Sequence, residues 1–320
     1  MATATRSVTS NELFNLLQEQ KNWPSGGAPA VLDLRPDEKR RVIRGSHRAY
    51  VSDDGTVAVA GASAREWMGR TLCLYDAQGE SLEDHGVVRA LLADQTSYRG
   101  EILLLSEPFA TFDAAYPFLC AKADSSKAAK RSLYPTCVLP GLLYLGDLTD
   151  AAALPRLREQ LNVQHCLTAL AELPPSLKAS VADAGVQHTW CNVRDVEEAD
   201  IKGHFSTAYH AIEAAQAAGT AVLVHCSRGV SRSASLCIAF LMRKEGWPAE
   251  RAREHVHATR PIILPNDGFW RCLQEFEKEL KGERSGVYVP MPVSKRVEEL
   301  EFELPPPWAA EPTHTKVDPK

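Results

Sequence analysis

The chain has 320 residues, of which 44% are hydrophobic and 24% are charged, and its formal net charge is -5. This composition is ordinary for a globular protein, and the length predicts two domains rather than one. The negative charge argues against nucleic acid as a partner, and no apolar run approaches the roughly 18 to 20 residues of a membrane-spanning helix.

The sequence contains eight cysteines, none of which forms a C-x-x-C pair or a cysteine and histidine cluster with zinc-finger spacing. The first residues, MATATRSVTSNELF, lack the apolar core of a secretory signal. Both features are typical of a reducing compartment. We therefore expect a cytoplasmic protein, with the nucleus and the mitochondrion as alternatives, that uses neither a metal nor another cofactor.

Alternating strand and helix patterns in residues 1–122 predict a small parallel α/β domain. Thr9 and Glu12 have the spacing of a capping box, and apolar residues on one helical face follow them. Helical spacing is also found in the segments that end at Leu92 and Tyr116. The predicted strands are residues 31–34, 71–76 and 101–105.

The polar and small residues of the segment 123–132 predict a linker to a second α/β domain, residues 133–281. One helix of this domain is predicted from Phe205, and another from Pro248, because proline is favoured in the first turn. Residues 282–320 contain many prolines and no sustained apolar period, which predicts a disordered tail. The predicted strands lie near residues 142–146, 163–169, 186–193 and 220–224.

The segment HCSRGVSRSAS, residues 225–235, follows a short apolar run and precedes a predicted helix, so that Cys226 lies at a strand-to-helix turn. A free cysteine with a pKa of about 8.5 is mostly protonated at neutral pH, whereas the thiolate is the nucleophile. The unpaired N–H groups and the positive dipole end of a helix N-terminus favour an anion. We therefore expect a lowered pKa for Cys226, and the same features bind phosphate.

The loop after Cys226 has the composition of a cradle for a tetrahedral dianion. Gly229 allows consecutive backbone N–H groups to turn inward, and Arg232 presents a planar guanidinium that can bind two phosphoryl oxygens. Ser233 can donate a hydrogen bond to the sulfur, both as attacking and as leaving group. The expected phosphate-binding residues are Ser227, Arg228, Gly229, Val230, Ser231 and Arg232.

These residues match the HCxxxxxR(S/T) signature, and the chain thereby resembles the cysteine-dependent protein tyrosine phosphatases, with a VSRSAS ending similar to their dual-specificity branch. The resemblance implies a phosphocysteine intermediate and a general acid in a preceding loop, without a metal. In CNVRDVEEADIKGHF, Asp195 lies ten residues before Phe205, which is the family's spacing for that acid. The alternatives are a purely solvated Asp195, or a general acid at Glu197, Glu198 or Asp200.

The segment RPIILPNDGFWRCLQEFE resembles the R-x-x-x-x-PN-x-GF segment of the same family. The resemblance implies that Asn266 braces the phosphate loop and that Arg260 supports the same wall. Asparagine before Asp-Gly is also a common turn residue, and this alternative stays open. For His225 the resemblance implies an orienting residue rather than a base, and the alternative is a core histidine with satisfied hydrogen bonds.

Segments of the first domain, among them VLDLR, TLCLYD and LLSEPFATFDAAYPFLC, resemble the rhodanese-like domain that precedes mitogen-activated protein kinase phosphatases. Asp76 occupies the place of the cysteine in active sulfurtransferases, which implies a catalytically inert regulatory domain. In those phosphatases a basic run of this domain docks the kinase, although a solvated charged face is the alternative here. In this chain the corresponding region, VSDDGTVAVAGASAREW, contains only Arg65 as a basic residue. The basic residues that lie earlier are Lys39, Arg40, Arg41, Arg44 and Arg48.

The predicted fold class is α/β in two domains: a rhodanese-like parallel α/β domain, then a protein tyrosine phosphatase-like domain with a central sheet flanked by helices. This order of domains is most similar to the serine/threonine/tyrosine-interacting-like pseudophosphatases, except that the catalytic cysteine is present. The predicted function is hydrolysis of phosphotyrosine and phosphoserine or phosphothreonine in phosphoprotein substrates.

Two alternatives to this function remain. The first is a phosphoprotein-binding scaffold with little turnover, and the second is a phosphatase of non-protein phosphates such as phosphoinositides. Arg228 provides a cation within the loop, as lipid-active relatives often do, whereas Val230 occupies a place that is basic in some of them.

Overall fold

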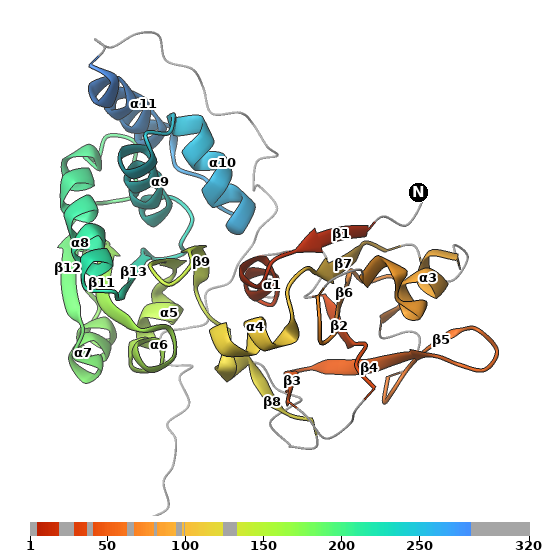
Figure 1. The fold of residues 1–320 in the computed structure, drawn as a ribbon. Coiled ribbons are helices and arrows are strands. Elements are labelled where there is room, and N and C mark those ends of the chain that lie inside the picture. The colour runs from red at the N-terminus through yellow and green to blue at the C-terminus, as the bar shows by residue number, and fades with distance from the viewer. Residues whose placement is uncertain are drawn as a thin grey trace, which may run out of the picture. The chain divides into compact units, whose positions relative to one another are not determined.

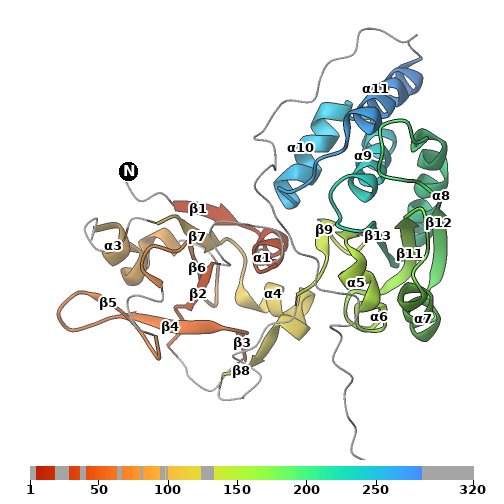
Figure 2. The same cartoon turned by 180° about the vertical axis from the view of Figure 1, so that it is seen from behind.

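The computed structural model describes residues 5–18, 29–36, 41–62, 67–79, 82–93, 98, 100–123 and 133–282. Within these residues the strands form two larger sheets and one two-stranded sheet (Figures 1 and 2). The mixed arrangement of sheets and helices agrees with the predicted α/β class.

The N-terminal sheet has six strands in the order β1-β7-β6-β2-β4-β5. All neighbours in it are parallel except β4 and β5, which pair antiparallel at the edge. A separate antiparallel pair joins β3 (Arg41–Ile43) to β8 (Cys120–Lys122). The six strands are β1 (Thr5–Val8), β7 (Ile102–Leu105), β6 (Leu72–Tyr75), β2 (Ala30–Asp33), β4 (Ser46–Val51) and β5 (Val57–Val59).

The predicted elements of this region are present, and additional strands accompany them. The capping box of Thr9 and Glu12 opens α1, as the sequence predicts. Strand β4 was not predicted, because only Ala49 of its six residues is buried and no alternating apolar pattern results. The helices are α1 (Ser10–Leu16), α3 (Gly86–Ala93) and α4 (Phe109–Ala115), with short 3-10 turns η2 (Leu82–Asp84) and η3 (Pro117–Leu119).

The C-terminal sheet has five strands in the order β12-β11-β13-β10-β9, and only β9 runs antiparallel to its neighbour. The central strand β13 is buried along its whole length, so both faces of the sheet are covered. The strands are β9 (Thr136–Leu139), β10 (Leu143–Gly146), β11 (Val163–Ala169), β12 (Gln187–Cys191) and β13 (Ala221–His225).

Helices cover this sheet in two groups, with α5, α6 and α7 on one face and α8, α9, α10 and α11 on the other (Figures 1 and 2). Pro248 is the N-cap of α10, one position before the first turn in which it was expected. The helices are α5 (Leu148–Ala152), α6 (Leu154–Leu161), α7 (Pro175–Ala184), η4 (Lys202–His204), α8 (Phe205–Ala217), α9 (Arg232–Glu245), α10 (Ala249–Thr259) and α11 (Asp267–Lys281).

Both larger sheets belong to the unit Met1–Pro290, and polar contacts join α1 to the edge strand β9. The Asn15 amide Nδ2 donates to the Cys137 carbonyl at 2.9 Å, and its Oδ1 accepts from the Cys137 N–H at 2.8 Å. The domain boundaries predicted at 122, 133 and 281 stay predictions. Residues 124–132 of the predicted linker and the predicted tail from 283 onward lie outside the described residues.

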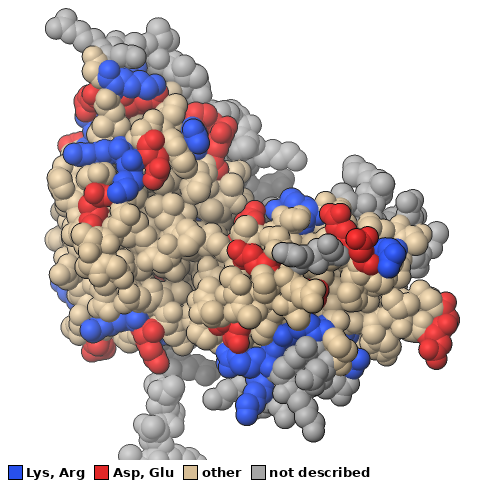
Figure 3. Space-filling view, viewed as in Figure 1, with Lys and Arg blue, Asp and Glu red and all other residues tan. Residues whose placement is uncertain are grey.

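The described basic residues before that region lie in or between β3 and β4, where Figure 3 shows Lys and Arg side chains gathered on one face. The Arg41 guanidinium makes an ion pair with Asp113 at 2.8 Å, and Arg44 Nε donates to the Phe118 carbonyl at 3.0 Å. The Arg48 guanidinium lies 5.7 Å from the centre of the Tyr50 ring. Lys39 and Arg40 lie outside the described residues.

No helix among the described residues is both long and apolar enough to pass through a lipid bilayer. Within the same residues no three or more histidine, cysteine, aspartate or glutamate side chains are grouped so that they could hold a metal ion.

Candidate active site

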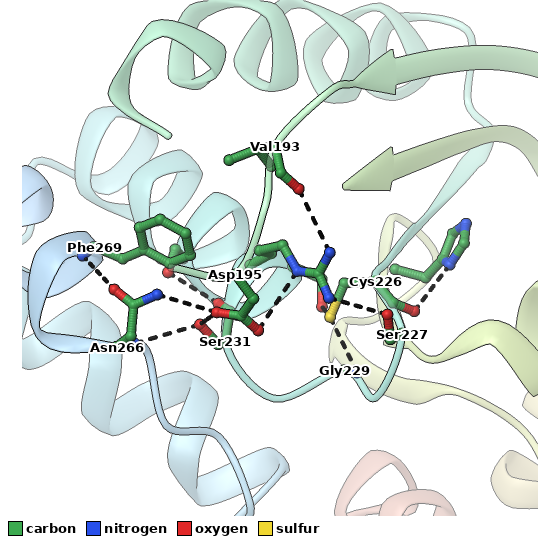
Figure 4. Close-up of polar contacts among 12 residues, drawn as sticks. Val193, Asp195, Cys226, Ser227, Gly229, Ser231, Asn266 and Phe269 are labelled. Atoms are coloured by element: carbon green, nitrogen blue, oxygen red, sulfur yellow. Dashed lines mark hydrogen bonds and ion pairs between the residues drawn. The ribbon is translucent and has the colours of Figure 1, made fainter. Parts of the chain in front are cut away.

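The candidate site is the turn between β13 and α9, at the carboxyl end of a central parallel strand (Figure 4). In open α/β sheets this end of the strands is where ligands bind. The buried strand ends at His225, Cys226 follows directly, and the helix begins at Arg232, as the sequence predicts. The 14-residue α9 therefore directs its N-terminal N–H groups toward the loop that contains the cysteine.

The Cys226 thiol lies at the base of this loop and is only 1% exposed. Its Sγ accepts hydrogen bonds from the Gly229 N–H at 3.2 Å and from the Ser233 hydroxyl at 3.2 Å. Burial disfavours the thiolate, but the hydrogen bonds from Ser233 and the backbone, together with the charge of Arg232, outweigh burial and lower the pKa of Cys226. The environment therefore favours a nucleophilic thiolate.

Gly229 has a positive φ of +66°, which an L-residue adopts only with strain. A Cβ at this position would also lie 2.6 Å from the Gly146 carbonyl oxygen and 2.8 Å from the Arg260 guanidinium. Both the backbone angle and the surrounding space therefore require glycine, and the loop keeps the curl that brings its N–H group to the sulfur.

Arg260 holds the outer side of the loop and is 1% exposed. Its Nε donates to the Gly229 carbonyl at 2.9 Å, and Nη2 donates to the Arg228 carbonyl at 3.2 Å. The third donor, Nη1, reaches the Thr136 hydroxyl of β9 at 3.1 Å. Because the two loop carbonyls face Arg260, the N–H groups of the same peptide units face the sulfur side of the loop.

The Arg232 guanidinium lies over the loop with 8% of the residue exposed. Its Nη2 donates to the Ser227 hydroxyl at 3.0 Å, and Nη1 reaches the Val193 carbonyl at 3.5 Å. Nε lies 3.5 Å from Asp195 Oδ2 but is buried without a hydrogen-bond partner among the described residues. A buried donor of this kind is satisfied when an anionic oxygen binds there.

Asp195 contacts the phosphate loop from the segment after β12 (Figure 4). Its Oδ1 accepts from the Ser231 hydroxyl at 2.7 Å and from Asn266 Nδ2 at 3.0 Å. Two of the alternative acids have other partners: Glu197 pairs with Arg271 at 2.8 Å, and Asp200 Oδ1 accepts from the Gly203 N–H at 2.9 Å. The structure thus brings Asp195 to the arginine of the loop.

Asn266 combines the two roles that the sequence left open. Its Oδ1 accepts from the Phe269 N–H at 2.9 Å and caps α11, which is the local role. Its N–H also approaches the Ser231 hydroxyl at 3.3 Å, and its Nδ2 holds Asp195, so the residue braces the loop. The remaining predicted loop residues take part mainly through the main chain: Arg228 is exposed, and the Val230 carbonyl accepts from the Leu264 N–H at 2.9 Å.

His225 is fully buried behind the cysteine. Burial lowers its pKa to about 4, so the ring is neutral near pH 7. Nδ1 lies 3.3 Å from the Cys226 carbonyl, and Nε2 lies 2.7 Å from the Thr168 hydroxyl. A neutral ring with both nitrogens engaged fits an orienting residue.

Sequence reasoning missed Thr168, Thr136 and Gly146. Thr168 is a polar residue near the end of the predicted strand VQHCLTA, and a polar group buried in a strand needs a partner. That signal could have indicated Thr168. Thr136 and Gly146 matter only through contacts with Arg260 and Gly229, which the sequence does not place beside them.

Comparison with known proteins agrees with the class that this geometry defines, a phosphatase with a cysteine nucleophile. Residues 143–279 match the family model described as dual specificity phosphatase, catalytic domain. The chain is 35% identical over 147 residues to dual specificity protein phosphatase 1 of Arabidopsis thaliana, covering 46% of this chain and 71% of that protein. The chain belongs to the dual-specificity phosphatase family.

Two further relatives show how much of the chain is shared. Dual specificity protein phosphatase 4 of chicken is 29% identical over 300 residues, which cover 80% of this chain and 78% of that protein. Protein phosphatase Slingshot homolog 3 of rat is 37% identical over 172 residues, or 51% of this chain. The chain spans about a quarter of the length of the Slingshot relative, since the match covers 25% of it.

Proposed function

We propose that the chain is an active dual-specificity protein phosphatase that hydrolyses phosphotyrosine and phosphoserine or phosphothreonine through a phosphocysteine intermediate. The observation that carries the proposal is that a Cys226 thiol of lowered pKa lies in the same loop region as the buried Nε–H of Arg232, which has no hydrogen-bond partner among the described residues. A nucleophile and an oxyanion-binding group are thus held together in one place.

In the first step the Cys226 thiolate attacks phosphorus, so that an S–P bond forms while the P–O bond to the leaving group breaks. The guanidinium of Arg232 and the N–H groups of the loop bind the nonbridging phosphoryl oxygens. Protonated Asp195 gives its proton to the leaving oxygen, which departs as a phenol or an alcohol. The Asp195 carboxyl group accepts hydrogen bonds from Ser231 and Asn266 at Oδ1, and its Oδ2 lies 3.5 Å from Arg232 Nε, beside the guanidinium that binds the phosphoryl oxygens.

In the second step a water molecule attacks the phosphocysteine, and Asp195 accepts a proton from that water. An O–P bond forms, the S–P bond breaks, and inorganic phosphate leaves with the thiolate restored. The Ser233 hydroxyl, 3.2 Å from Sγ, donates to the departing sulfur and stabilises its negative charge. The charge that Cys226 carries at the start is therefore recovered at the end of each cycle.

Hydrolysis of an aryl phosphate and of matched phosphotyrosine and phosphothreonine peptides tests the proposal, with reductant and without added metal. We expect Cys226→Ser to remove the activity and Asp195→Asn to lower kcat by about 10² to 10⁴-fold. Glu197→Gln is the matched control, because Glu197 lies in the same segment and pairs with Arg271 instead. A control as damaged as Asp195→Asn would contradict the assignment of the acid.

The same assay decides between the other readings. A wild-type protein that binds the phosphopeptides but turns none of them over would be a scaffold. Faster hydrolysis of phosphoinositide in vesicles than of any phosphopeptide would instead assign the site to lipid substrates, with the exposed Arg228 as the natural cation for the headgroup.

For the N-terminal region, we propose an inert rhodanese-like regulatory domain that docks a protein kinase through Arg41, Arg44 and Arg48. Two observations support the proposal. The three arginines lie in or between the neighbouring segments β3 and β4, and the loop after β6 begins with Asp76 in place of a cysteine. Replacing the three arginines with glutamate should abolish co-purification of a mitogen-activated protein kinase and leave aryl phosphate hydrolysis unchanged; retained co-purification would contradict it. A reducing compartment, the cytoplasm or the nucleus, suits a catalytic thiol.

A further inference from the structure

A row of three polar side chains crosses the C-terminal sheet behind the nucleophile. It consists of His188 on β12, Thr168 on β11 and His225 on β13, three strands that lie side by side. The Thr168 hydroxyl lies 2.9 Å from His188 Nε2 and 2.7 Å from His225 Nε2. Thr168 and His225 are both fully buried, so their polar groups depend on one another for hydrogen bonds.

The register of the strands explains why these side chains meet. Thr168 is paired with His225 across β11 and β13, and His188 is paired with Cys166 across β11 and β12. Alternate residues of a strand point to the same face, so Cys166 and Thr168 share a face, and His188 lies diagonally beside Thr168 on it.

Chemistry fixes the direction of the hydrogen bonds in this row. The Cys226 carbonyl can only accept, so His225 Nδ1, 3.3 Å away, carries the hydrogen. In the buried neutral ring Nε2 then has a lone pair and accepts from the Thr168 hydroxyl. The single hydroxyl hydrogen of Thr168 is thereby used, so its oxygen accepts from the Nε2–H of His188. The donors run in one direction, from His188 to Thr168, to His225 and to the Cys226 carbonyl.

We propose that Thr168 and His188 are positioning residues for the nucleophile, which act by fixing the tautomer and the orientation of His225. His225 in turn holds the carbonyl of the peptide unit between Cys226 and Ser227, at the start of the phosphate loop. The orientation of this peptide unit sets how the Cys226 side chain and the first N–H of the loop face the phosphate. The importance of the row for catalysis rests on the proposed function.

Two other arrangements would not have this effect. If Thr168 only satisfied its own buried hydroxyl, either histidine would suffice as its partner, and the orientation of the His225 ring would not depend on Thr168. If His188 only filled the edge of the sheet, it would resemble His165, whose Nε2 lies 2.8 Å from the Thr189 hydroxyl. The pair of His165 and Thr189 lies on the same two strands and provides a matched comparison.

The test is the pH dependence of the rate at which iodoacetate alkylates Cys226, which reports the thiolate fraction without any turnover. Thr168→Val keeps the shape of the side chain but removes its donor and acceptor. We expect it to raise the apparent pKa of Cys226 by about half a unit to one unit, the scale of one hydrogen bond. Thr168→Ser should restore the wild-type profile, and His188→Phe should give a smaller shift in the same direction.

Thr189→Val is the matched control, since it removes a hydroxyl from the same sheet outside the row, and its alkylation profile should equal that of wild type. The ionisable groups whose charges affect the pKa of His225 are His188, Asp147 and Arg232, and the charge of His188 also affects the pKa of His165. Thr168→Val changes none of these groups. The ¹⁵N signals of His225 should show a hydrogen on Nδ1 in wild type and in Thr168→Ser.

A wild-type alkylation profile in both Thr168→Val and His188→Phe would overturn the proposal, as would an equal shift in Thr189→Val. Should Thr168→Val fail to fold, His188→Phe and the ¹⁵N signals of the wild type still decide the matter. Because alkylation requires no phosphatase activity, the result stands apart from the proposed function: an inactive wild type with these shifts would refute the activity and leave the positioning row intact.

Discussion

The loops that follow β6 in the N-terminal sheet and β13 in the C-terminal sheet occupy corresponding places, since each strand is third in the order of its sheet. Both loops contain a glycine with positive φ, at Gly79 and Gly229, and both direct main-chain N–H groups toward the residue directly after the strand. The residue after the strand is Asp76 in one loop and Cys226 in the other.

This one difference decides what the N–H groups bind. Asp76 Oδ1 accepts from the N–H groups of Gln78 at 2.9 Å and Gly79 at 2.6 Å, so the loop is closed by its own carboxylate. At Cys226 the anionic group is a thiolate, and Arg232 adds a buried donor without a hydrogen-bond partner among the described residues. The loop in the N-terminal sheet therefore binds its own carboxylate, whereas the loop in the C-terminal sheet is suited to bind an external anion.

The largest effect should come from the group found only in the second loop. Arg232→Lys keeps the charge but cannot present two parallel donors to a phosphoryl group. We expect kcat/KM for an aryl phosphate to fall by about 10³-fold, the scale of removing an oxyanion-binding donor. Arg271→Lys is the control, since that arginine makes an exposed pair with Glu197. A loss of less than about threefold in Arg232→Lys would contradict the role of the guanidinium.

The last residues of the two strands should differ in their response to acid. Burial lowers the pKa of His225 to about 4, below the value of about 6.5 in an unfolded chain. The neutral ring is therefore favoured in the folded state, and this contribution to stability is lost as the pH falls from about 6.5 to about 4. Burial raises the pKa of Tyr75 at the end of β6, so that residue stays protonated throughout this range.

Urea unfolding at several pH values measures this effect. The quantity to compare is the difference in free energy of unfolding between the wild type and His225→Asn. We expect this difference to be smaller at pH 4 than at pH 7 by roughly 2 to 3 kcal/mol. The difference between the two proteins isolates His225 from His165 and His188, whose pKa values burial also lowers. Parallel pH profiles for wild type and variant would show that His225 is not the source.

The two glycines should separate stability from activity. Gly229→Ala and Gly79→Ala both place a Cβ at positive φ, the first against the Gly146 carbonyl and the second against the main chain of Glu107. Each should lower the free energy of unfolding by about 1 to 3 kcal/mol. Only Gly229→Ala should reduce the activity per folded molecule, measured at a temperature at which both variants are folded. Equal activities would mean that the curl of the second loop is not needed.

The smallest effect is expected at the carboxylate that closes the first loop. Asp76→Ala removes the acceptor of two loop N–H groups that water can partly replace, so we expect a loss of about 1 kcal/mol in unfolding free energy. Phosphatase activity should not change, because the residue lies outside the phosphate loop. Thermal unfolding and aryl phosphate hydrolysis measure the two quantities. A strong loss of activity without unfolding would show that the first loop contributes to catalysis.

The two regions also differ in how well the sequence predicted them. Strand β11 was predicted with its observed bounds, Val163–Ala169, and six of its seven residues are buried. Strands β1 and β4 were missed, because their mostly exposed residues leave no apolar pattern. The helix α7 was missed for a similar reason, since Ser180 and Ala184 supply part of its buried face.

At the site the sequence predicted Cys226, Arg232 and Ser233 together, because one strand-loop-helix segment carries all three. The contact of Asp195 with Asn266, which lie 71 residues apart, was implied only by the family resemblance. The row through Thr168 could not be predicted, because it depends on the order and register of three strands. The residues that act within one segment could therefore be predicted from the sequence, whereas the residues that orient them could be identified only from the tertiary structure.

Direct detection of a phosphorylated Cys226 is the decisive measurement. Asp195→Asn should hydrolyse the intermediate slowly, because water then lacks its general base, so rapid acid quenching during turnover should trap it. We predict one added phosphoryl group on the peptide that contains Cys226. Iodine, which cleaves the S–P bond and leaves phosphoserine intact, should release this group, and Cys226→Ser should not carry it. Turnover by the wild type with no phosphoryl group on Cys226 at any quench time, together with an active Cys226→Ser, would contradict the cysteine mechanism.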